Sequence, residues 1–116
     1  MSWKLYGYAK CSTCGKAKKW LEARGVDFEE IPIRETPPSV AELRVGLVAA
    51  AGNWRKITNT SSQDYRDGWK ATFSQASEAE ILEALSTHGN LVKRPFVIQG
   101  KTALSGFRPA EWEAVF

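Results

Sequence analysis

Hydrophobic and polar positions alternate along the first third of the chain in a pattern that predicts a strand, a helix and a second strand. Residues 3–8 form a short aromatic and aliphatic run, which is typical of a buried strand. In residues 13–24, small or apolar side chains recur every three or four positions opposite a lysine-rich side, and Gly25 follows as a helix stop. A second apolar run at 28–33 then predicts a strand parallel to the first, reached by a right-handed crossover.

The middle of the chain is predicted to be helical, with two clear helix starts. Ser39 and Glu42 have the spacing of a capping box and predict a helix to about residue 51, and Ser77 and Glu80 predict a second helix to residue 88. The segment between these helices is rich in polar turn residues, and it predicts no more than one short helix near 61–66.

The last section of the chain predicts a β-hairpin followed by a helix. Two apolar runs flank Gly100 and Lys101, and Pro109 stands where the first residue of a closing helix is expected. The whole pattern indicates an α/β fold with a mixed sheet, in which a helical insertion separates a β-α-β half from a β-β-α half. We expect a single domain over residues 1–116, with its core at about 1–35 and 91–116 and the insertion at about 36–90.

Composition and charge narrow the class of protein. The 116 residues are 43% hydrophobic, enough for a core without metals or disulfides, and the net charge of +3 comes from interspersed basic and acidic residues. Because no basic stripe is present, the sequence favours a small anionic substrate and no direct nucleic-acid partner. The most apolar run, 45–52, is far shorter than the roughly 20 residues of a membrane span, and no signal-peptide pattern is found. We therefore expect a cytoplasmic protein without membrane association.

Cys11 and Cys14 form a CxxC motif between the first strand and the first helix, a motif that can bind a metal, form a structural disulfide or carry out redox chemistry. A zinc site needs about four ligands, but the chain offers only these thiols and His88, so no metal site is predicted. A structural disulfide across so short a loop would restrain the unfolded chain little, and a reducing compartment disfavours it. Redox chemistry fits best, because Cys11 would meet the free N–H groups of a helix N-terminus while Cys14 lies one turn inward. Two ordinary free cysteines remain the alternative.

Three segments of the chain resemble the ArsC/Spx/YffB group of arsenate-reductase-related proteins. They are the stretch from LYGYAKCSTC into the second strand, ITNTSSQDYR in the insertion, and LVKRPFVIQGKTALSGFRP near the end. CxxC alone is weakly specific, but its combination with KRPFVI and GFRP is typical of the group. The resemblance implies a thioredoxin-like (glutaredoxin-like) fold. It also implies a nucleophilic Cys11, a cis Pro95 that faces it, and a set of substrate-binding residues made of Arg94, Pro95 and Arg108.

The sequence departs from the arsenate reductases of that group at two positions. Ser61 occupies the place of a third arginine, and a dianion such as arsenate is best bound by planar guanidinium groups. Arg55 or Arg66 could reach in from the insertion, although both are more typical of surface charges. Cys14 is the second departure, because the resolving thiol lies elsewhere in the glutathione- and glutaredoxin-dependent reductases, whereas Spx-like regulators carry CxxC as a redox switch.

The main functional hypothesis is a thiol-dependent oxidoreductase. In it, the Cys11 thiolate attacks arsenate or a disulfide, and Cys14 or glutathione resolves the adduct. No bound cofactor is expected, and glutathione with glutaredoxin, or thioredoxin, would supply electrons. The first alternative is an Spx-type regulator that binds RNA polymerase and uses both cysteines to sense oxidation. The second is an inactive or binding-only relative.

Overall fold

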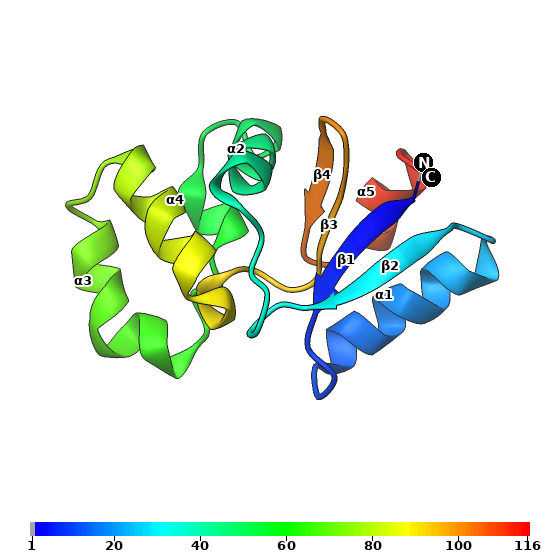
Figure 1. Cartoon of the computed structure of the whole chain (residues 1–116), viewed down its shortest axis with the longest axis horizontal. Coiled ribbons are helices and arrows are strands. Elements are labelled where there is room, and N and C mark those ends of the chain that lie inside the picture. The colour runs from blue at the N-terminus through cyan, green and yellow to red at the C-terminus, as the bar shows by residue number, and fades with distance from the viewer. Residues whose placement is uncertain (1) are drawn as a thin grey trace.

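The structure, a computed structural model that describes residues 2–116, has a central sheet with helices on both faces (Figure 1). The strands and helices follow the order that the sequence predicts for the two halves and the insertion. In chain order they are β1 (Trp3–Gly7), α1 (Ser12–Ala23), β2 (Phe28–Pro32), α2 (Val40–Ala49), the 3₁₀ turn η1 (Trp54–Ile57), the π-helical turn η2 (Tyr65–Trp69), α3 (Lys70–Phe73), α4 (Glu78–Thr87), the 3₁₀ turn η3 (Gly89–Leu91), β3 (Phe96–Gln99), β4 (Thr102–Ser105) and α5 (Pro109–Glu113).

The four strands lie in the order β2-β1-β3-β4 and form a mixed sheet. β1 pairs in parallel with β2, placing Leu5 beside Glu30, and pairs antiparallel with β3, placing Leu5 beside Val97. β3 and β4 form the predicted hairpin around Gly100, whose positive φ of 58° suits the turn. The mixed sheet, its parallel first pair and its closing hairpin are therefore confirmed.

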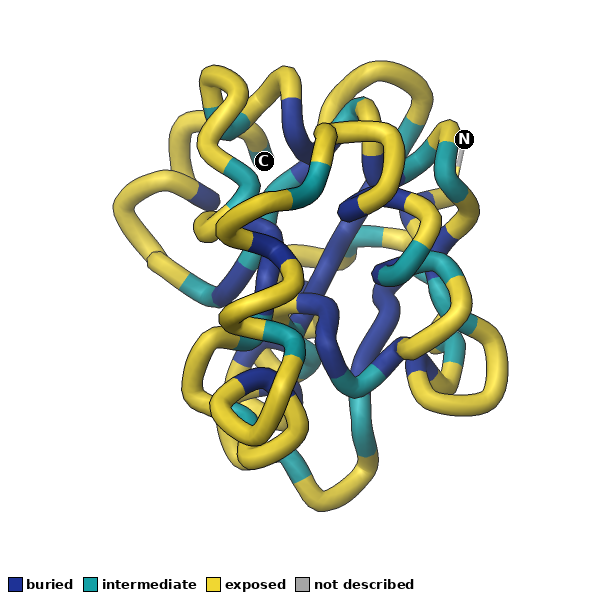
Figure 2. Tube along the Cα trace, turned by 90° about the vertical axis from the view of Figure 1, so that its left-hand side faces the viewer, coloured by how far each residue is buried: buried dark blue, intermediate teal, exposed yellow. Residues whose placement is uncertain are grey.

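Each face of the sheet is covered by a separate apolar core. On one face α1 and α5 bury a cluster that includes Leu5, Leu21 and Trp112, and the indole Nε1 of Trp112 donates to the Gly106 carbonyl at 3.1 Å. On the other face, α2 and the rest of the insertion pack over a larger cluster that includes Phe96. Figure 2 shows the buried segments running through the centre of the molecule, with exposed turns around them.

The segment between α2 and α4 contains the short helix expected near 61–66, but the helix is longer than predicted. Its helical residues run from 63 to 73 and include η2 and α3. The physical reason is aromatic packing: Tyr65, Trp69 and Phe73 recur every four residues, and both Tyr65 and Phe73 contact the ring of Trp54, at centroid distances of 6.5 and 5.5 Å. Because most residues between these aromatic side chains are polar, the sequence of this segment was interpreted mainly as turns.

Gly89 joins the end of the insertion to the loop that follows β2. A Cβ atom at this position would lie 1.8 Å from the carbonyl oxygen of Ile33, so any larger residue would separate the two segments. This close backbone approach brings Asn90 and Arg34 to the same hollow. It fixes one side of the candidate site described below.

Helix α2 is attached to the sheet through Glu42. Its carboxylate completes a capping box with Ser39, accepts a hydrogen bond from the buried Tyr6 hydroxyl at 2.7 Å, and pairs with Lys4 Nζ at 3.1 Å. Burial acts to raise the pKa of Glu42, but the hydrogen bonds from Tyr6, Ser39 and Lys4 outweigh it, and the pKa is lowered. The carboxylate form therefore stabilises the folded state.

We expect Glu42→Gln to lower the free energy of unfolding by about 1 to 2 kcal/mol at pH 7. A carboxyl group whose folded-state pKa is lowered contributes its stability above the unfolded-state pKa of about 4.3 and loses it as the pH falls through the folded-state value. Denaturant titrations from pH 7 to pH 3 should therefore show the variant and the wild type converging. Glu83→Gln on the exposed side of α4 is the control, with an expected change within about 0.5 kcal/mol. A loss that is equal at every pH would mean that shape, not charge, is responsible.

Candidate active site

Cys11 is the N-cap residue of α1. Its backbone is extended, with φ −87° and ψ 114°, and its Sγ accepts a hydrogen bond from the backbone N–H of Cys14 at 3.3 Å. The backbone N–H of Cys11 donates to the Tyr8 carbonyl at 3.0 Å, which fixes the loop between strand and helix. No acidic residue occupies the first turn of α1, so the helix N-terminus faces the Cys11 sulfur without a competing carboxylate. The prediction that Cys11 lies at a helix N-terminus is confirmed.

Cys14 lies one turn further on and is only 5% exposed. Burial raises the pKa of the Cys14 thiol to about 12, assisted by its hydrogen bond to Cys11, while the Tyr8 backbone N–H and the positive charge of Arg94 act in the opposite direction. The close passage of β1 explains the burial, because a Cβ atom on Gly7 would lie 3.4 Å from the Cys14 sulfur. The two thiols are therefore in contact but chemically unlike.

The difference between the thiols predicts unequal alkylation. Cys11 should react with iodoacetamide at pH 7 about tenfold faster than Cys14 or more, since each unit by which the Cys14 pKa is raised lowers its thiolate fraction tenfold. Peptide mass spectrometry after short incubations measures both rates. In the unfolded protein the rates should become similar. Equal rates in the folded protein would remove the assignment of Cys11 as the nucleophile.

Arg94 lies beside the cysteine pair at the start of β3. The Arg94–Pro95 peptide bond is cis, as the resemblance implies, Pro95 is buried, and its carbonyl accepts from the Gly106 N–H at 2.8 Å. The guanidinium group of Arg94 lies 5.3 Å above the Tyr8 ring, and its Nη1 is buried without a hydrogen-bond partner among the described residues. A buried N–H donor without a partner is costly, and an anion accepting from it would remove that cost.

A hollow of about 330 Å³ lies next to Arg94, between the sheet and the insertion. Two charged residues that line it, Arg34 and Asp64, were not predicted from the sequence. Arg34 lines it together with Ser61, and Arg34 also stacks on the Tyr8 ring at 4.4 Å and donates to the Tyr8 hydroxyl at 3.5 Å. Tyr8 thus lies against two guanidinium groups. The signal was present in the sequence, because Arg34 follows β2, and parallel strands place their carboxyl ends at one edge of a sheet. Asp64 also lines the hollow and opposes an anion there.

The structure places Arg108 in a different hollow from Arg94. This second hollow, of about 570 Å³, is also lined by Arg55 and Lys93, and the Arg108 side chain is 73% exposed, 4.0 Å from Glu111. Within residues 2–116, no described contact joins Arg108 to Cys11 or Arg94. Arg55 stacks on Trp54 at 4.4 Å, and neither it nor the exposed Arg66 lines the hollow of Arg94. The nearby guanidinium group that sequence reasoning sought in the insertion is therefore that of Arg34.

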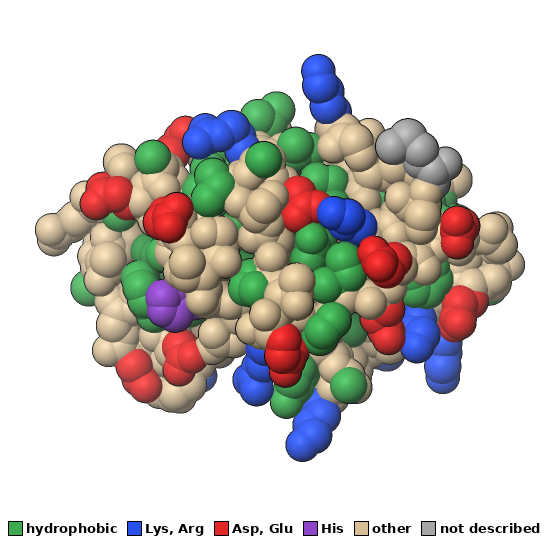
Figure 3. Space-filling model, viewed as in Figure 1, with side chains coloured by type: hydrophobic (Ala, Val, Ile, Leu, Met, Phe, Trp, Pro, Cys, Tyr) green, Lys and Arg blue, Asp and Glu red, His purple; other side chains and the backbone are tan. Residues whose placement is uncertain are grey.

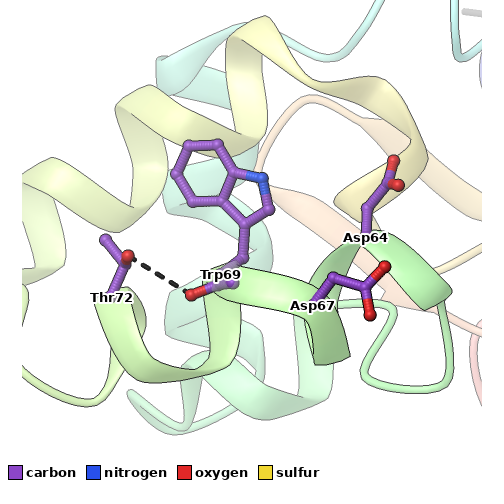
Figure 4. A pocket seen from close by; sticks show the side chains of 5 residues that line it. Asp64, Asp67, Trp69 and Thr72 are labelled. Atoms are coloured by element: carbon purple, nitrogen blue, oxygen red, sulfur yellow. Dashed lines mark hydrogen bonds between the residues drawn. The ribbon is translucent and has the colours of Figure 1, made fainter.

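Other surfaces of the molecule are less suited to an anionic substrate. A hollow of about 400 Å³ in the insertion is lined by Asp64 and Asp67, beside Trp69 and Thr72 (Figure 4), and Thr72 Oγ1 donates to the Gly68 carbonyl at 3.4 Å.

Figure 3 shows Lys and Arg side chains at the lower end of the molecule, around the turn from β1 to α1. Among the described residues, no group of three His, Cys, Asp or Glu side chains could hold a metal ion, and no helix is long and apolar enough to cross a bilayer.

The sheet order, the CxxC pair at the start of α1 and the cis proline before β3 together define a thioredoxin-like protein with a helical insertion. The chain belongs to the ArsC family, whose model matches residues 6–115. The chain also resembles the structure of a possible arsenate reductase from Streptococcus mutans UA159, with 34% identity, a TM-score of 0.87 and coverage of 98% of both chains.

The sequence relatives differ in what their names describe. YusI of Bacillus subtilis, an uncharacterized protein, is 41% identical over 114 residues, which are 97% of each chain. The global transcriptional regulator Spx 2 of Bacillus anthracis is 29% identical over 107 residues, covering 92% of this chain and 81% of the regulator. The relatives of this chain therefore include both reductase-like and regulatory proteins, and their names do not assign a single activity to the site.

Proposed function

We propose that the protein is a thiol-dependent reductase in which Cys11 is the nucleophile and Cys14 resolves the intermediate. The observation that carries the proposal is the contact between two unlike thiols, with the Cys14 N–H donating to the Cys11 sulfur at 3.3 Å. Arg94, with its unpartnered Nη1, would bind an anionic group of the substrate, and Pro95 would shape the wall beside it. Arg108 is assigned a role in the first attraction of anions, because it is exposed and lies outside the hollow of Arg94.

With a disulfide as substrate, the electrons balance in two steps. The Cys11 thiolate attacks one sulfur, forms a mixed disulfide and expels a thiolate; Cys14 then loses its proton, attacks the Cys11 sulfur, and expels the second thiolate. With arsenate, Cys11 forms an arsenic–sulfur bond with loss of water. Attack of a second thiol, from Cys14 or glutathione, on the Cys11 sulfur then leaves two electrons on arsenic and releases arsenite.

The oxidised protein needs an external reductant to complete a catalytic cycle. The proposed function is therefore tested by supplying different electron donors. Arsenate and small disulfides should be assayed in parallel with glutathione and glutaredoxin, and with thioredoxin and its reductase, following NADPH consumption. We expect disulfide reduction with at least one donor, and none by Cys11→Ser. Wild-type activity in Cys11→Ser, or no activity of the wild type on any substrate, would contradict the proposal.

A second candidate function is a redox-sensing regulator that binds RNA polymerase. It is favoured by the Spx 2 relative and by the possession of both cysteines of a CxxC motif. Copurification of RNA polymerase with the oxidised form, but not with the reduced form or with Cys11→Ser, would support this function. Multiple turnover on a disulfide without any polymerase binding would favour the reductase.

A further inference from the structure

A separate hollow of about 420 Å³ lies under α1, and it is lined by Cys14 while Cys11 is not among its lining residues. Its floor is the sheet, where Leu5 and Gly7 of β1 lie beside Glu30 and Pro32 of β2. The hollow is distinct from that of Arg94, with which it shares no lining residue. The buried thiol of the pair is therefore approached from a second side.

Gly15 opens the space at the wall formed by α1, because it leaves a helical turn that lines the hollow without a side chain. At Gly7 the sheet instead passes close to the thiol, and a Cβ atom there would lie 3.4 Å from the Cys14 sulfur. A Cβ atom on Gly15 would meet no atom within 4 Å, so the residue is not required by packing. Glycine inside a helix is less stable than alanine, because it loses more backbone freedom on folding. This position therefore keeps a residue that weakens α1 and leaves a passage to Cys14.

We infer that a small zwitterionic thiol enters this hollow and reduces the Cys11–Cys14 disulfide by attacking the Cys14 sulfur. The inference rests on the proposed function, because it concerns the disulfide that this function creates. It identifies the electron donor as a low-molecular-weight thiol. The ground for this choice is that Cys14 is only 5% exposed and lines a recess between α1 and the sheet, which a small molecule enters more readily than the thiol of a folded protein.

The chemistry of the pair favours attack at Cys14. The incoming thiolate forms a bond to the Cys14 sulfur, the Cys11–Cys14 bond breaks, and its electron pair leaves on Cys11, which accepts the Cys14 N–H bond as a thiolate. Attack at Cys11 would instead expel Cys14, whose burial makes its thiolate the poorer leaving group. A second thiol then attacks the mixed disulfide, giving a thiol disulfide and returning both cysteines to the reduced state.

The charges around the hollow indicate the kind of thiol. Lys18 on α1 and Glu30 on β2 form an ion pair at 3.3 Å between the two walls, and Glu35 lies beside them. A ligand with both a carboxylate and an ammonium group can replace these partners one for one, so an amino-acid or peptide thiol fits better than an uncharged one. The volume is within the range of small-ligand sites and suits a thiol of that size.

The test fills the hollow without touching Cys11. Gly15→Leu places a side chain in the open space, and Gly15→Ala is the matched control, since both residues are good helix formers. Each oxidised protein is mixed with glutathione, quenched with iodoacetamide, and mapped by mass spectrometry. We expect glutathione on Cys14 and the alkyl group on Cys11, with reduction slowed about tenfold or more in Gly15→Leu, since a decade needs only about 1.4 kcal/mol of steric opposition. At equal concentration of reactive thiolate, glutathione should also act faster than 2-mercaptoethanol.

A second measurement keeps the inference independent of the proposed function. In the Cys11→Ser background no internal disulfide is needed, and glutathione disulfide can be used to label Cys14 directly at pH 9. The ratio of rates for Gly15→Leu and Gly15→Ala then reports access alone. Equal rates, or glutathione found on Cys11 in the first experiment, would overturn the inference. Failure of the wild type to form any disulfide would instead count against the proposed function, and this ratio would still decide whether the hollow gives access to Cys14.

Discussion

Cys11→Ser is expected to lower turnover on the reductase substrate by at least about a thousandfold. A serine hydroxyl is not ionised at neutral pH and cannot form the sulfur–sulfur bond on which the reaction depends, so loss of the nucleophile removes the chemical step entirely. Folding should be unaffected, because serine is an N-cap residue at least as favourable as cysteine. The measurement is the initial rate with the best donor, together with circular dichroism of the variant.

Cys14→Ser provides the matched variant for the same experiment. It retains the nucleophile but removes the resolving thiol, so it should accumulate a mixed disulfide between Cys11 and the substrate or glutathione, which mass spectrometry will detect. Cys11→Ser should accumulate no such adduct during turnover. Full turnover in Cys14→Ser without a mixed disulfide would show that Cys14 serves packing and not chemistry.

Oxyanion binding should respond strongly to the arginines of the Arg94 hollow. We predict weak or absent arsenate reduction by the wild type, because Ser61 lines this hollow at the position where the resemblance to arsenate reductases implies a third arginine. Ser61→Arg should strengthen arsenate binding by about 1.5 to 3 kcal/mol, or about one to two decades, and Arg94→Ala should weaken it comparably. Disulfide reduction should change much less, since a neutral disulfide depends less on fixed cations.

Thr60→Arg is the control for this pair of variants. It adds the same charge one residue away, but Thr60 lines the hollow that contains Arg108. Calorimetry with arsenate should detect no comparable gain. If Thr60→Arg strengthens binding while Arg94→Ala has no effect, the anion site lies at Arg108, and the assignment of Arg94 is wrong.

Most of the fold could be predicted because short local sequence patterns identify its helices and turns. The capping boxes at Ser39 and Ser77 fixed two helix starts to the residue, and Gly100 marked the hairpin. The helix that contains η2 and α3 was predicted too short, because its spacing of aromatic residues is meaningful only once Trp54 packs against it. That contact joins residues from separate elements, and no local pattern encodes it.

The candidate site was also predicted only in part, because some of its residues follow from local patterns and others depend on tertiary packing. The positions of Cys11 and Cys14 follow from a strand that ends and a helix that begins, so the sequence predicted them directly. Arg34 was missed because its role depends on Tyr8, a residue on a neighbouring strand end, and on the placement that Gly89 gives to the insertion. The separation of Arg108 from Arg94 also depends on how the insertion packs, and the motifs that contain these arginines do not show it.

The pairing of β1 with β3, which places Leu5 beside Val97, has a consequence for the order in which the protein folds. The two strands come from opposite ends of the chain, so the centre of the sheet closes only after the whole insertion has been synthesised. Until then β1 has no β3 beside it, so a parallel pair of β1 and β2 has an unpaired edge on each side. Closing so long a loop lowers the conformational entropy of the chain before the contacts between β1 and β3 can compensate for that loss. The barrier to folding is therefore expected to lie at this step. The newly made N-terminal half is therefore the stage most exposed to aggregation.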